Sequence, residues 1–232
     1  MGEARAHRAR AVRESAASAD RHAVPRRRMA ERLARAGVSD PRVLDAFAAV
    51  PRHRLVPEAL AGQAYRETAL PIGDGQTISA PGVVAAMSQA LALEGHETVL
   101  EVGTGSAYQA AILARLAARV ISIERVPRLA AAARRSLDAL RVDNVVVYLG
   151  DGSRGRPTDA PFDAIVVTAG GPSVPEPLLA QLAIGGRLVG PFGERDEQQL
   201  LRIRRTARDR YTREVIGRCR FVDLVGAHGW DA

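Results

Sequence analysis

Short apolar runs alternate with longer amphipathic runs through the centre of this 232-residue chain. The short runs are rich in valine, isoleucine and leucine and have the length of buried strands, whereas the longer runs carry apolar residues at helical spacing. This alternation predicts an α/β fold with a doubly wound, mostly parallel sheet. The expected strands are residues 98–103, 120–124, 144–151, 162–169 and 186–193, and the expected helices are residues 106–118, 127–141 and 175–183.

The two ends of the chain follow different patterns. From Arg28 to Leu60 apolar residues recur at helical spacing, with breaks at Gly37 and Pro51, which predicts an N-terminal helical addition. Near the other end, two apolar runs, 199–207 and 213–225, are separated by a segment too short for a crossover. We therefore expect a C-terminal antiparallel hairpin at the edge of the sheet.

The length favours one domain with a tail. Eight arginines, three acids and few large aliphatic residues in residues 1–28 predict a basic, disordered tail without the apolar core of a secretory signal. Because Cys219 is the only cysteine, no internal disulfide is possible, and a cytoplasmic protein is expected. The remaining chain, 29–232, is expected to form one domain made of a helical addition (29–75), a cofactor-binding core (76–195) and a hairpin (196–232).

Charge and rare residues narrow the possible functions. The formal net charge is +7, but the excess lies in residues 1–28 and 198–220, and the rest of the chain is net acidic. This distribution favours a solvated arginine face over a nucleic-acid site, although a patch for acidic partners stays open. The five histidines are scattered, so we expect no metal site, and no apolar run is long enough to span a membrane.

Candidate binding residues follow the first central strand, where an open α/β sheet binds its ligands. Glu101 lies in that strand, and Gly103, Thr104, Gly105 and Ser106 come after it. The glycines permit a tight turn and close approach of a ligand, but an ordinary strand-to-helix turn would also use them. A dinucleotide fingerprint needs Gly or Ala five residues after the first glycine, where this chain has tyrosine, so NAD is disfavoured.

Acidic residues also end the next two strands. Glu124 is placed to accept hydrogen bonds from ribose hydroxyls, or else pairs with Arg125 or caps the following helix. Asp151, followed by Gly152, is placed to accept from an adenine amino group, or else is a turn aspartate. Acids in register on three successive strands indicate a nucleoside-containing cofactor.

The acidic-x-Gly-x-Gly pattern of residues 101–105 resembles motif I of class I S-adenosylmethionine-dependent methyltransferases. Over a longer span, "GQTISAP", "VLEVGTGSAYQAAILA" and "FDAIVVTAGGPSVPEPLLAQLAIGGRLVGPFG" are similar to the protein-L-isoaspartate O-methyltransferase family, from about Met29 to the hairpin. The resemblance implies a seven-stranded, Rossmann-like methyltransferase sheet and S-adenosyl-L-methionine as cofactor. It also implies repair of isoaspartyl residues in damaged peptides and proteins.

The same resemblance implies residue roles. In the family, the Thr-Ile-Ser loop lies over the cofactor and its serine, here Ser79, is the active-site residue, with Thr77 beside it. Without the resemblance, Ser79 is better interpreted as a helix N-cap. The residues expected to bind the cofactor are Gln76, Ile78, Glu101, Gly103, Thr104, Gly105, Ser106, Glu124, Arg125, Asp151 and Gly152.

Methyl transfer to a carboxylate fits a site without a base. A carboxylate is already ionised at neutral pH, so the protein has only to align it with the methyl donor and exclude water. Hydroxyls can hold the carboxylate without adding charge. Two alternatives stay open: a class I methyltransferase with a different carboxylate acceptor, and a module that binds cofactor or peptide without turnover. The sequence does not fix the oligomeric state, and a monomer is slightly favoured.

Two positions depart from the family pattern. Ala107 stands where a glycine is common, which suits a backbone that is already helical there. Gly82 stands where a larger residue such as His or Tyr is common, so we expect a looser loop or a missing substrate contact.

Overall fold

The computed structural model describes residues 21–231, and most of the predicted tail, residues 1–20, lies outside the described part. Among the described residues no helix is long and apolar enough to cross a membrane. The α-helices are α2 (Ala23–Arg35), α3 (Pro41–Ala49), α4 (Pro81–Ala90), α5 (Tyr108–Leu113), α6 (Pro127–Ala139) and α7 (Glu176–Ala180). The strands are β1 (Leu70–Gly73), β2 (Gln76–Ile78), β3 (Thr98–Val102), β4 (Arg119–Glu124), β5 (Val145–Leu149), β6 (Phe162–Val167), β7 (Leu182–Gly193), β8 (Gln198–Ala207) and β9 (Arg210–Cys219).

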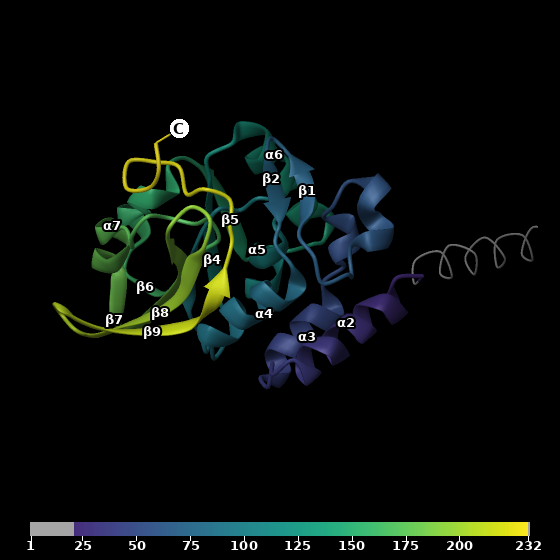
Figure 1. Ribbon diagram of the computed structural model, residues 1–232, viewed down its shortest axis with the longest axis horizontal. Helices are drawn as coiled ribbons and strands as arrows, with labels where there is room; N and C mark the ends of the chain where they lie inside the picture. The colour runs from purple at the N-terminus through teal and green to yellow at the C-terminus, as the bar shows by residue number, and fades with distance from the viewer. Residues whose placement is uncertain (1–20, 232) are drawn as a thin grey trace, which may run out of the picture.

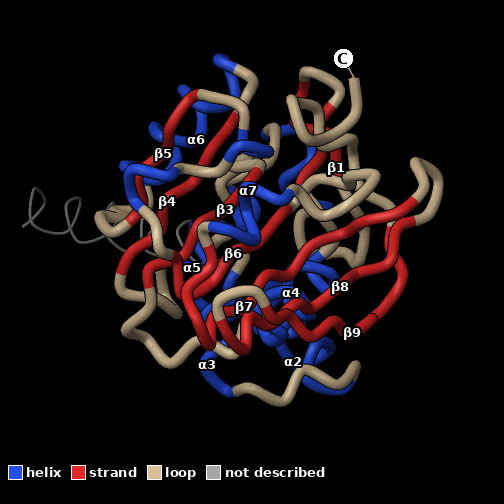
Figure 2. The backbone as a smooth tube through the Cα atoms, turned by 90° about the vertical axis from the view of Figure 1, so that its left-hand side faces the viewer, coloured by secondary structure: helices blue, strands red, loops and turns tan. Residues whose placement is uncertain are grey.

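Seven of these strands form one twisted sheet in the order β5-β4-β3-β6-β7-β8-β9 (Figures 1 and 2). Strands β3 to β7 pair in parallel, and β8 and β9 continue the sheet as antiparallel strands. The predicted doubly wound sheet with a C-terminal antiparallel hairpin is therefore confirmed. Chain order reverses between β3 and β6, which makes the carboxyl ends of these two strands the switch point where such sheets bind ligands.

Alternate strand residues face two hydrophobic clusters, one on each side of the sheet. Val99 and Val120 belong to the larger cluster, which also holds the buried faces of α2 to α6. Their neighbours Leu100 and Ile121 belong to the smaller cluster on the other side, together with Leu178 of α7. Both faces of the central strands are covered, which explains their near-continuous apolar sequence.

The helical addition begins earlier than predicted. Helix α2 starts at Ala23, so the boundary of the disordered tail at residue 28 is wrong. One arginine of the predicted tail is anchored to a neighbouring element, because Arg26 Nε donates to the carbonyl of Ala48 at 2.6 Å. Further along the same helix, Arg32 Nη2 donates to the carbonyl of Tyr65 at 2.5 Å. Composition alone does not distinguish such anchored arginines from solvated ones.

The predicted division at residue 75 falls inside a small hairpin. Strands β1 and β2 form a separate two-stranded antiparallel sheet, and Gly75 lies in its turn. The helical addition and the core therefore share a sheet and do not separate there. The hairpin carries Gln76 and Thr77 out toward the carboxyl ends of the main sheet, next to the start of α4 (Figure 1).

The last strand is shorter than predicted. It ends at Cys219, and the chain from residue 220 to residue 231, here called the C-terminal segment, leaves the sheet edge and returns across the strand ends (Figure 1). The segment forms a parallel bridge between Asp223 and Gly170, with the amide of Leu224 donating to the carbonyl of Gly170 at 2.8 Å. Tertiary contacts, not edge pairing, therefore determine the path of residues 220–225.

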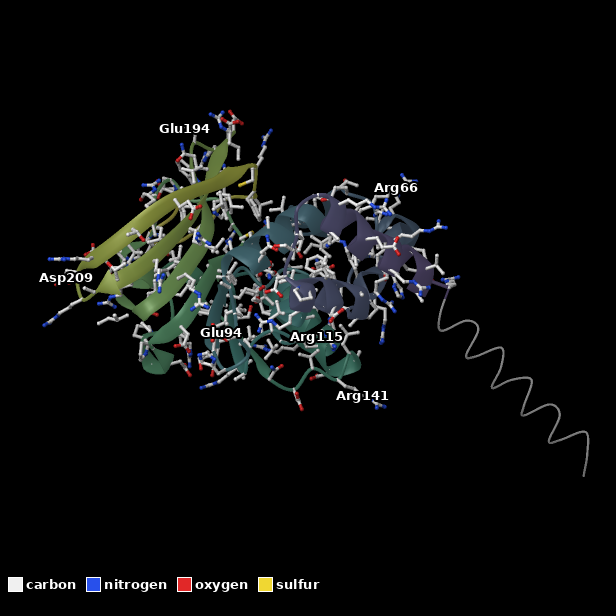
Figure 3. All side chains as sticks on the ribbon, turned by 90° about the horizontal axis from the view of Figure 1, so that it is seen from below. Arg66, Glu94, Arg115, Arg141, Glu194 and Asp209 are labelled. Atoms are coloured by element: carbon white, nitrogen blue, oxygen red, sulfur yellow. The ribbon has the colours of Figure 1, made fainter. Side chains whose placement is uncertain are left out.

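Several arginines of the hairpin find local partners. Arg202 pairs with Glu214 at 2.5 Å, and Arg218 pairs with Glu197 at 3.0 Å. Figure 3 shows Asp209 at the tip of this hairpin, at the opposite end of the molecule from Arg66 on the helical addition. Such exposed pairs contribute little stability, and they support the interpretation of a solvated face.

Candidate active site

A cavity lies over the switch point of the sheet. Its floor is the turn after β3 and the end of β6, one side is the β2 strand with the start of α4, and the other side is the C-terminal segment. All but two of the predicted site residues line it: Gln76, Thr77, Ile78, Ser79, Gly103, Thr104, Gly105, Ser106, Glu124, Arg125 and Gly152. Glu101 and Asp151 do not. A single cavity thus joins the predicted cofactor residues to the predicted catalytic loop.

Ser79 is not the N-cap of α4. The N-cap residue is Ala80, whose side chain cannot accept a hydrogen bond. The free amide at the helix start is taken instead by a carboxylate, because Gly82 N donates to Glu67 Oε1 at 2.6 Å. The capping interpretation of Ser79 is therefore wrong, and its hydroxyl is left for the cavity that it lines.

The same carboxylate lies close to the glycine at position 82. A Cβ there would lie 2.6 Å from Glu67 Oε1, closer than two such atoms approach. Gly82 leaves room for a close contact between the start of α4 and the exposed carboxylate of Glu67, and the expectation of a looser loop or a missing substrate contact stays a prediction. A negative charge at a helix N-terminus is also favourable.

Glu124 organises the turn after β3. Its Oε2 accepts from Gly105 N at 2.8 Å, and its Oε1 accepts from Val126 N at 2.9 Å. The side chain is 6% exposed and lines the cavity. Each carboxylate oxygen accepts more than one hydrogen bond, so the remaining lone pairs are available to ribose hydroxyls. The capping alternative is not seen, because the start of α6 has no side-chain cap and Glu124 accepts only from Val126, the residue before the helix.

Glu101 is buried behind the cavity floor. Its Oε2 accepts from Ser122 Oγ, which in turn lies 2.5 Å from the hydroxyl of Thr104, a residue of the cavity floor. Burial raises the pKa of Glu101 to about 8. The hydrogen bond from the Ser122 hydroxyl opposes this with a smaller lowering, and the nearby carboxylate of Glu124 adds a further, smaller raising effect. Glu101 is therefore protonated at neutral pH and reaches the cavity only through two hydroxyls.

The substitution Glu101→Gln is expected to flatten the pH dependence of stability. The unfolded chain has a glutamate pKa of about 4.3, and the folded value is about 8. The folded state keeps a proton that the unfolded state loses, so the wild type loses stability as pH rises through this window, by up to about 1.4 kcal/mol per pH unit. Glutamine carries no charge, so the free energy of unfolding of the variant rises relative to that of the wild type between about pH 5 and about pH 8. Urea unfolding across this range measures the difference, and parallel profiles would contradict the assignment.

Asp151 holds the C-terminal segment. Its Oδ2 accepts from Ala227 N at 2.8 Å, and its Oδ1 accepts from Ser153 N at 2.9 Å and from Ser153 Oγ at 2.6 Å. Burial opposes ionisation, but these hydrogen bonds hold the pKa of Asp151 below its usual value. The direct contact with adenine stays a prediction. In this arrangement the residue acts on the cavity through the segment that it fixes.

Ala107 has a left-handed backbone. Its φ is +67°, at the residue before α5, so the expectation of an already helical conformation is wrong. This conformation costs alanine roughly 1–2 kcal/mol, because its Cβ approaches the following carbonyl oxygen. Glycine has no Cβ and avoids this cost.

The substitution Ala107→Gly is therefore expected to stabilise the fold by about 1 kcal/mol, after the greater flexibility of glycine in the unfolded chain is subtracted. Chemical denaturation of the two proteins measures the change. A loss of stability of similar size would show that the lost methyl packing outweighs the relief of strain.

Sequence reasoning missed several residues of the cavity wall. Thr168 follows β6, and its position at a strand end at the switch point could have indicated it. Tyr108 and Gln109 follow the glycine turn directly, but the pattern there indicated only a helix. No local signal places the C-terminal segment, which reaches the cavity with Phe221, Val222, Asp223, Leu224 and Val225.

The floor of the cavity fits a flat ligand close to the backbone. Gly103 has a φ of +97°, and a Cβ there would lie 2.5 Å from Thr168 Oγ1. That hydroxyl lies 2.9 Å from the carbonyl oxygen of Val102 and 2.6 Å from that of Gly103, and its single proton is donated to one of them, which ties the turn to the end of β6. A carboxylate in the cavity can accept hydrogen bonds from ribose hydroxyls, and Ile123 and Leu224 supply apolar walls for a flat ring. The residues present therefore fit an adenosyl cofactor. Among the described residues no group of three or more possible metal ligands gathers.

A cavity that fits an adenosyl cofactor, at the switch point of an α/β sheet with this strand order, is typical of a class I S-adenosylmethionine-dependent methyltransferase. A sequence model described as protein-L-isoaspartate(D-aspartate) O-methyltransferase matches residues 25–229. The chain belongs to this family. The protein-L-isoaspartate O-methyltransferase of Syntrophus aciditrophicus is 53% identical over 214 residues, which is 91% of this chain and 98% of the relative.

Solved structures agree. One protein-L-isoaspartate O-methyltransferase superposes with a TM-score of 0.77 at 29% identity and covers 88% of this chain and 67% of that one. A second, from Plasmodium falciparum, is described as a protein-L-isoaspartate O-methyltransferase in complex with S-adenosyl-L-homocysteine. It has a TM-score of 0.75 at 25% identity and covers 86% of this chain and 98% of its own.

Proposed function

We propose that this protein transfers the methyl group of S-adenosyl-L-methionine to the free carboxylate of L-isoaspartyl residues in damaged peptides and proteins. The supporting observation is that one cavity joins the residues suited to the cofactor with the hydroxyls of Thr77 and Ser79. Membership of the family supports the same activity and cofactor.

The residues divide the work along the cavity. Glu124 and the turn at Gly103 and Gly105 would hold the adenosyl cofactor, which supplies an electrophilic methyl group when bound. The hydroxyls of Thr77 and Ser79 hold the acceptor carboxylate by hydrogen bonds that add no charge. Because the carboxylate is already ionised, no side chain has to remove a proton.

Apolar side chains keep water out of the reacting end. Ile78, Val84 and Met87 line the cavity beside the hydroxyls, and Phe221 of the C-terminal segment lines the other side. A cation and an anion neutralise each other in this reaction, so water stabilises the reactants more than the transition state. Excluding water therefore lowers the barrier.

We also propose that a monomer suffices and that the protein works in the cytoplasm. The described part of one chain supplies every wall of the cavity, which supports the first proposal. The single cysteine, Cys219, is half-buried and its pKa is raised by burial, so nothing in the chain depends on an oxidising compartment.

A pair of peptides that differ only in Asp or isoAsp at one position tests the function. With labelled S-adenosylmethionine, we expect a base-labile methyl ester on the isoAsp peptide only. Equal labelling of both peptides would indicate another carboxylate acceptor. Cofactor binding by calorimetry without transfer to either peptide would indicate a binding module.

A further inference from the structure

Asp223 contributes a carboxylate to the wall of the cavity that is proposed to receive a carboxylate. The residue belongs to the C-terminal segment, lines the cavity, and has 37% of its side chain exposed. Among the described residues, the other charged members of the lining are Glu124 and Arg125, which lie together at the end of β4. An unpaired negative charge in this wall would repel an anionic acceptor.

The position of Asp223 associates it with the acceptor and not with the ribose. Asp223 forms a bridge with Gly170, which follows β6, and so lies on the opposite side of β3 from the end of β4. The segment forms the wall across the cavity from the Thr77–Ser79 loop, whose hydroxyls are proposed to hold the acceptor carboxylate. An acceptor bound there therefore lies in the electric field of Asp223.

Arg195 neutralises this carboxylate from outside the cavity. It lies in the turn between β7 and β8, and its Nε is 3.3 Å from Asp223 Oδ2. Its guanidinium also stacks on the ring of Trp230, with Cζ 4.7 Å from the ring centroid. The backbone of the turn is fixed as well, because Gln198 Nε2 donates to the carbonyl of Arg195 at 2.9 Å. Since Arg195 does not line the cavity, its charge acts on Asp223 and not directly on a ligand.

Other bonds than this ion pair hold the segment in place. The amide of Leu224 donates to the carbonyl of Gly170 at 2.8 Å, and Trp230 Nε1 donates to the same carbonyl at 3.0 Å. Further along, the amide of Ala227 donates to Asp151 Oδ2 at 2.8 Å. Both side chains of the ion pair are more than a third exposed, and exposed pairs contribute little to stability. The main consequence of the pair is therefore electrostatic.

We infer that Arg195 allows the cavity to accept an anionic substrate by cancelling the charge of Asp223 in the cavity wall. The inference rests on the proposed function, because it takes the acceptor to be a carboxylate. Arg195 is thus a specificity-determining residue that acts through Asp223 and touches neither acceptor nor cofactor. Without it, a like charge opposes the approach of the acceptor carboxylate, whereas a neutral group would be unaffected.

The test removes each charge alone and then both charges together. Arg195→Met is expected to raise KM for an isoAsp peptide about fivefold at low ionic strength, because Asp223 becomes an unpaired anion in the wall. Asp223→Asn is expected to lower KM, because Arg195 then presents an unpaired cation. The double variant is expected to return KM to the wild-type value. The Kd for S-adenosylhomocysteine is expected to be unchanged in all three proteins.

Ionic strength gives a second readout that a purely structural role would not change. Raising the salt from about 0.01 M to about 1 M shortens the Debye length from about 30 Å to about 3 Å, so the effect of Arg195→Met on KM is expected to fade. Arg218→Met is the matched control, because it removes the same charge and leaves Glu197, the partner of Arg218 at 3.0 Å, unpaired outside the cavity. Its KM is expected to equal that of the wild type at both salt concentrations.

A double variant with the same raised KM as Arg195→Met would overturn the inference, because Arg195 would then act by a route other than Asp223. An unchanged KM in Arg195→Met at low salt, or a raised Kd for S-adenosylhomocysteine with KM intact, would overturn it as well. Should Arg195→Met fail to fold, Asp223→Asn decides alone, since an unchanged or raised KM in that variant contradicts the inference. A wild type that methylates no isoAsp peptide would overturn the proposed function itself.

Discussion

Replacing Glu124 by glutamine is expected to weaken binding of S-adenosylhomocysteine by about 30-fold, because hydrogen bonds to a buried carboxylate lose strength when the acceptor loses its charge. The two carboxylate oxygens accept from the amides of Gly105 and Val126. A glutamine has one oxygen, so its NH₂ group must face one of these donors and the turn shifts. The ribose hydroxyls lose a charged acceptor at the same time. Isothermal titration calorimetry measures the change in Kd.

The chain offers a close control in Glu97. This carboxylate is also buried and also accepts from two backbone amides, those of Glu94 and Gly95, each at 2.8 Å. It lies before β3, at the opposite end of the strand from the cavity. Glu97→Gln is expected to lower stability and leave the Kd unchanged. A similar loss of affinity in both variants would mean that Glu124 acts only through folding.

The substitution Ser79→Ala is expected to lower kcat about 100-fold and to change the Kd for S-adenosylhomocysteine by less than about threefold, because a small misplacement of reacting groups is costly in rate. The cap of α4 is supplied by Glu67, so the hydroxyl of Ser79 is not needed for folding. Its loss therefore affects the acceptor carboxylate and not the helix. Single-turnover kinetics with a saturating isoAsp peptide separate transfer from binding.

Ser136→Ala, a change of the same size on α6 outside the lining of the cavity, serves as control and should behave as the wild type. Wild-type kinetics for Ser79→Ala would remove this serine from the catalytic residues. A loss of thermal stability equal to the loss of an N-cap, about 1 kcal/mol, would restore the capping interpretation.

Much of the fold could be predicted because its signals are local. Strands buried on both faces show as apolar runs. An aspartate followed by a proline is a typical helix start, and Asp40 caps α3 in this way, with its carboxylate accepting from Arg42 N at 2.9 Å. The same logic failed where packing decides. Helix α2 begins before residue 28, where Arg26 reaches the carbonyl of Ala48, and β7 begins at Leu182, which pairs with Phe162 of β6.

The candidate site divides in the same way. The residues after β3 and β4 could be predicted, because the order of strands and helices along the sequence indicates which residues follow the carboxyl ends of the strands. The C-terminal segment could not, since Asp151, Ser153 and Gly170 bring it to the cavity from far along the sequence.

The most direct test of the account is a crystal structure of the protein with S-adenosylhomocysteine bound. The account predicts the ribose hydroxyls on the carboxylate of Glu124, the adenine between the end of β4 and the C-terminal segment, and the sulfur directed toward the hydroxyl of Ser79. Density for the ligand in any other cavity, or a sulfur directed away from the Thr77–Ser79 loop, would contradict it.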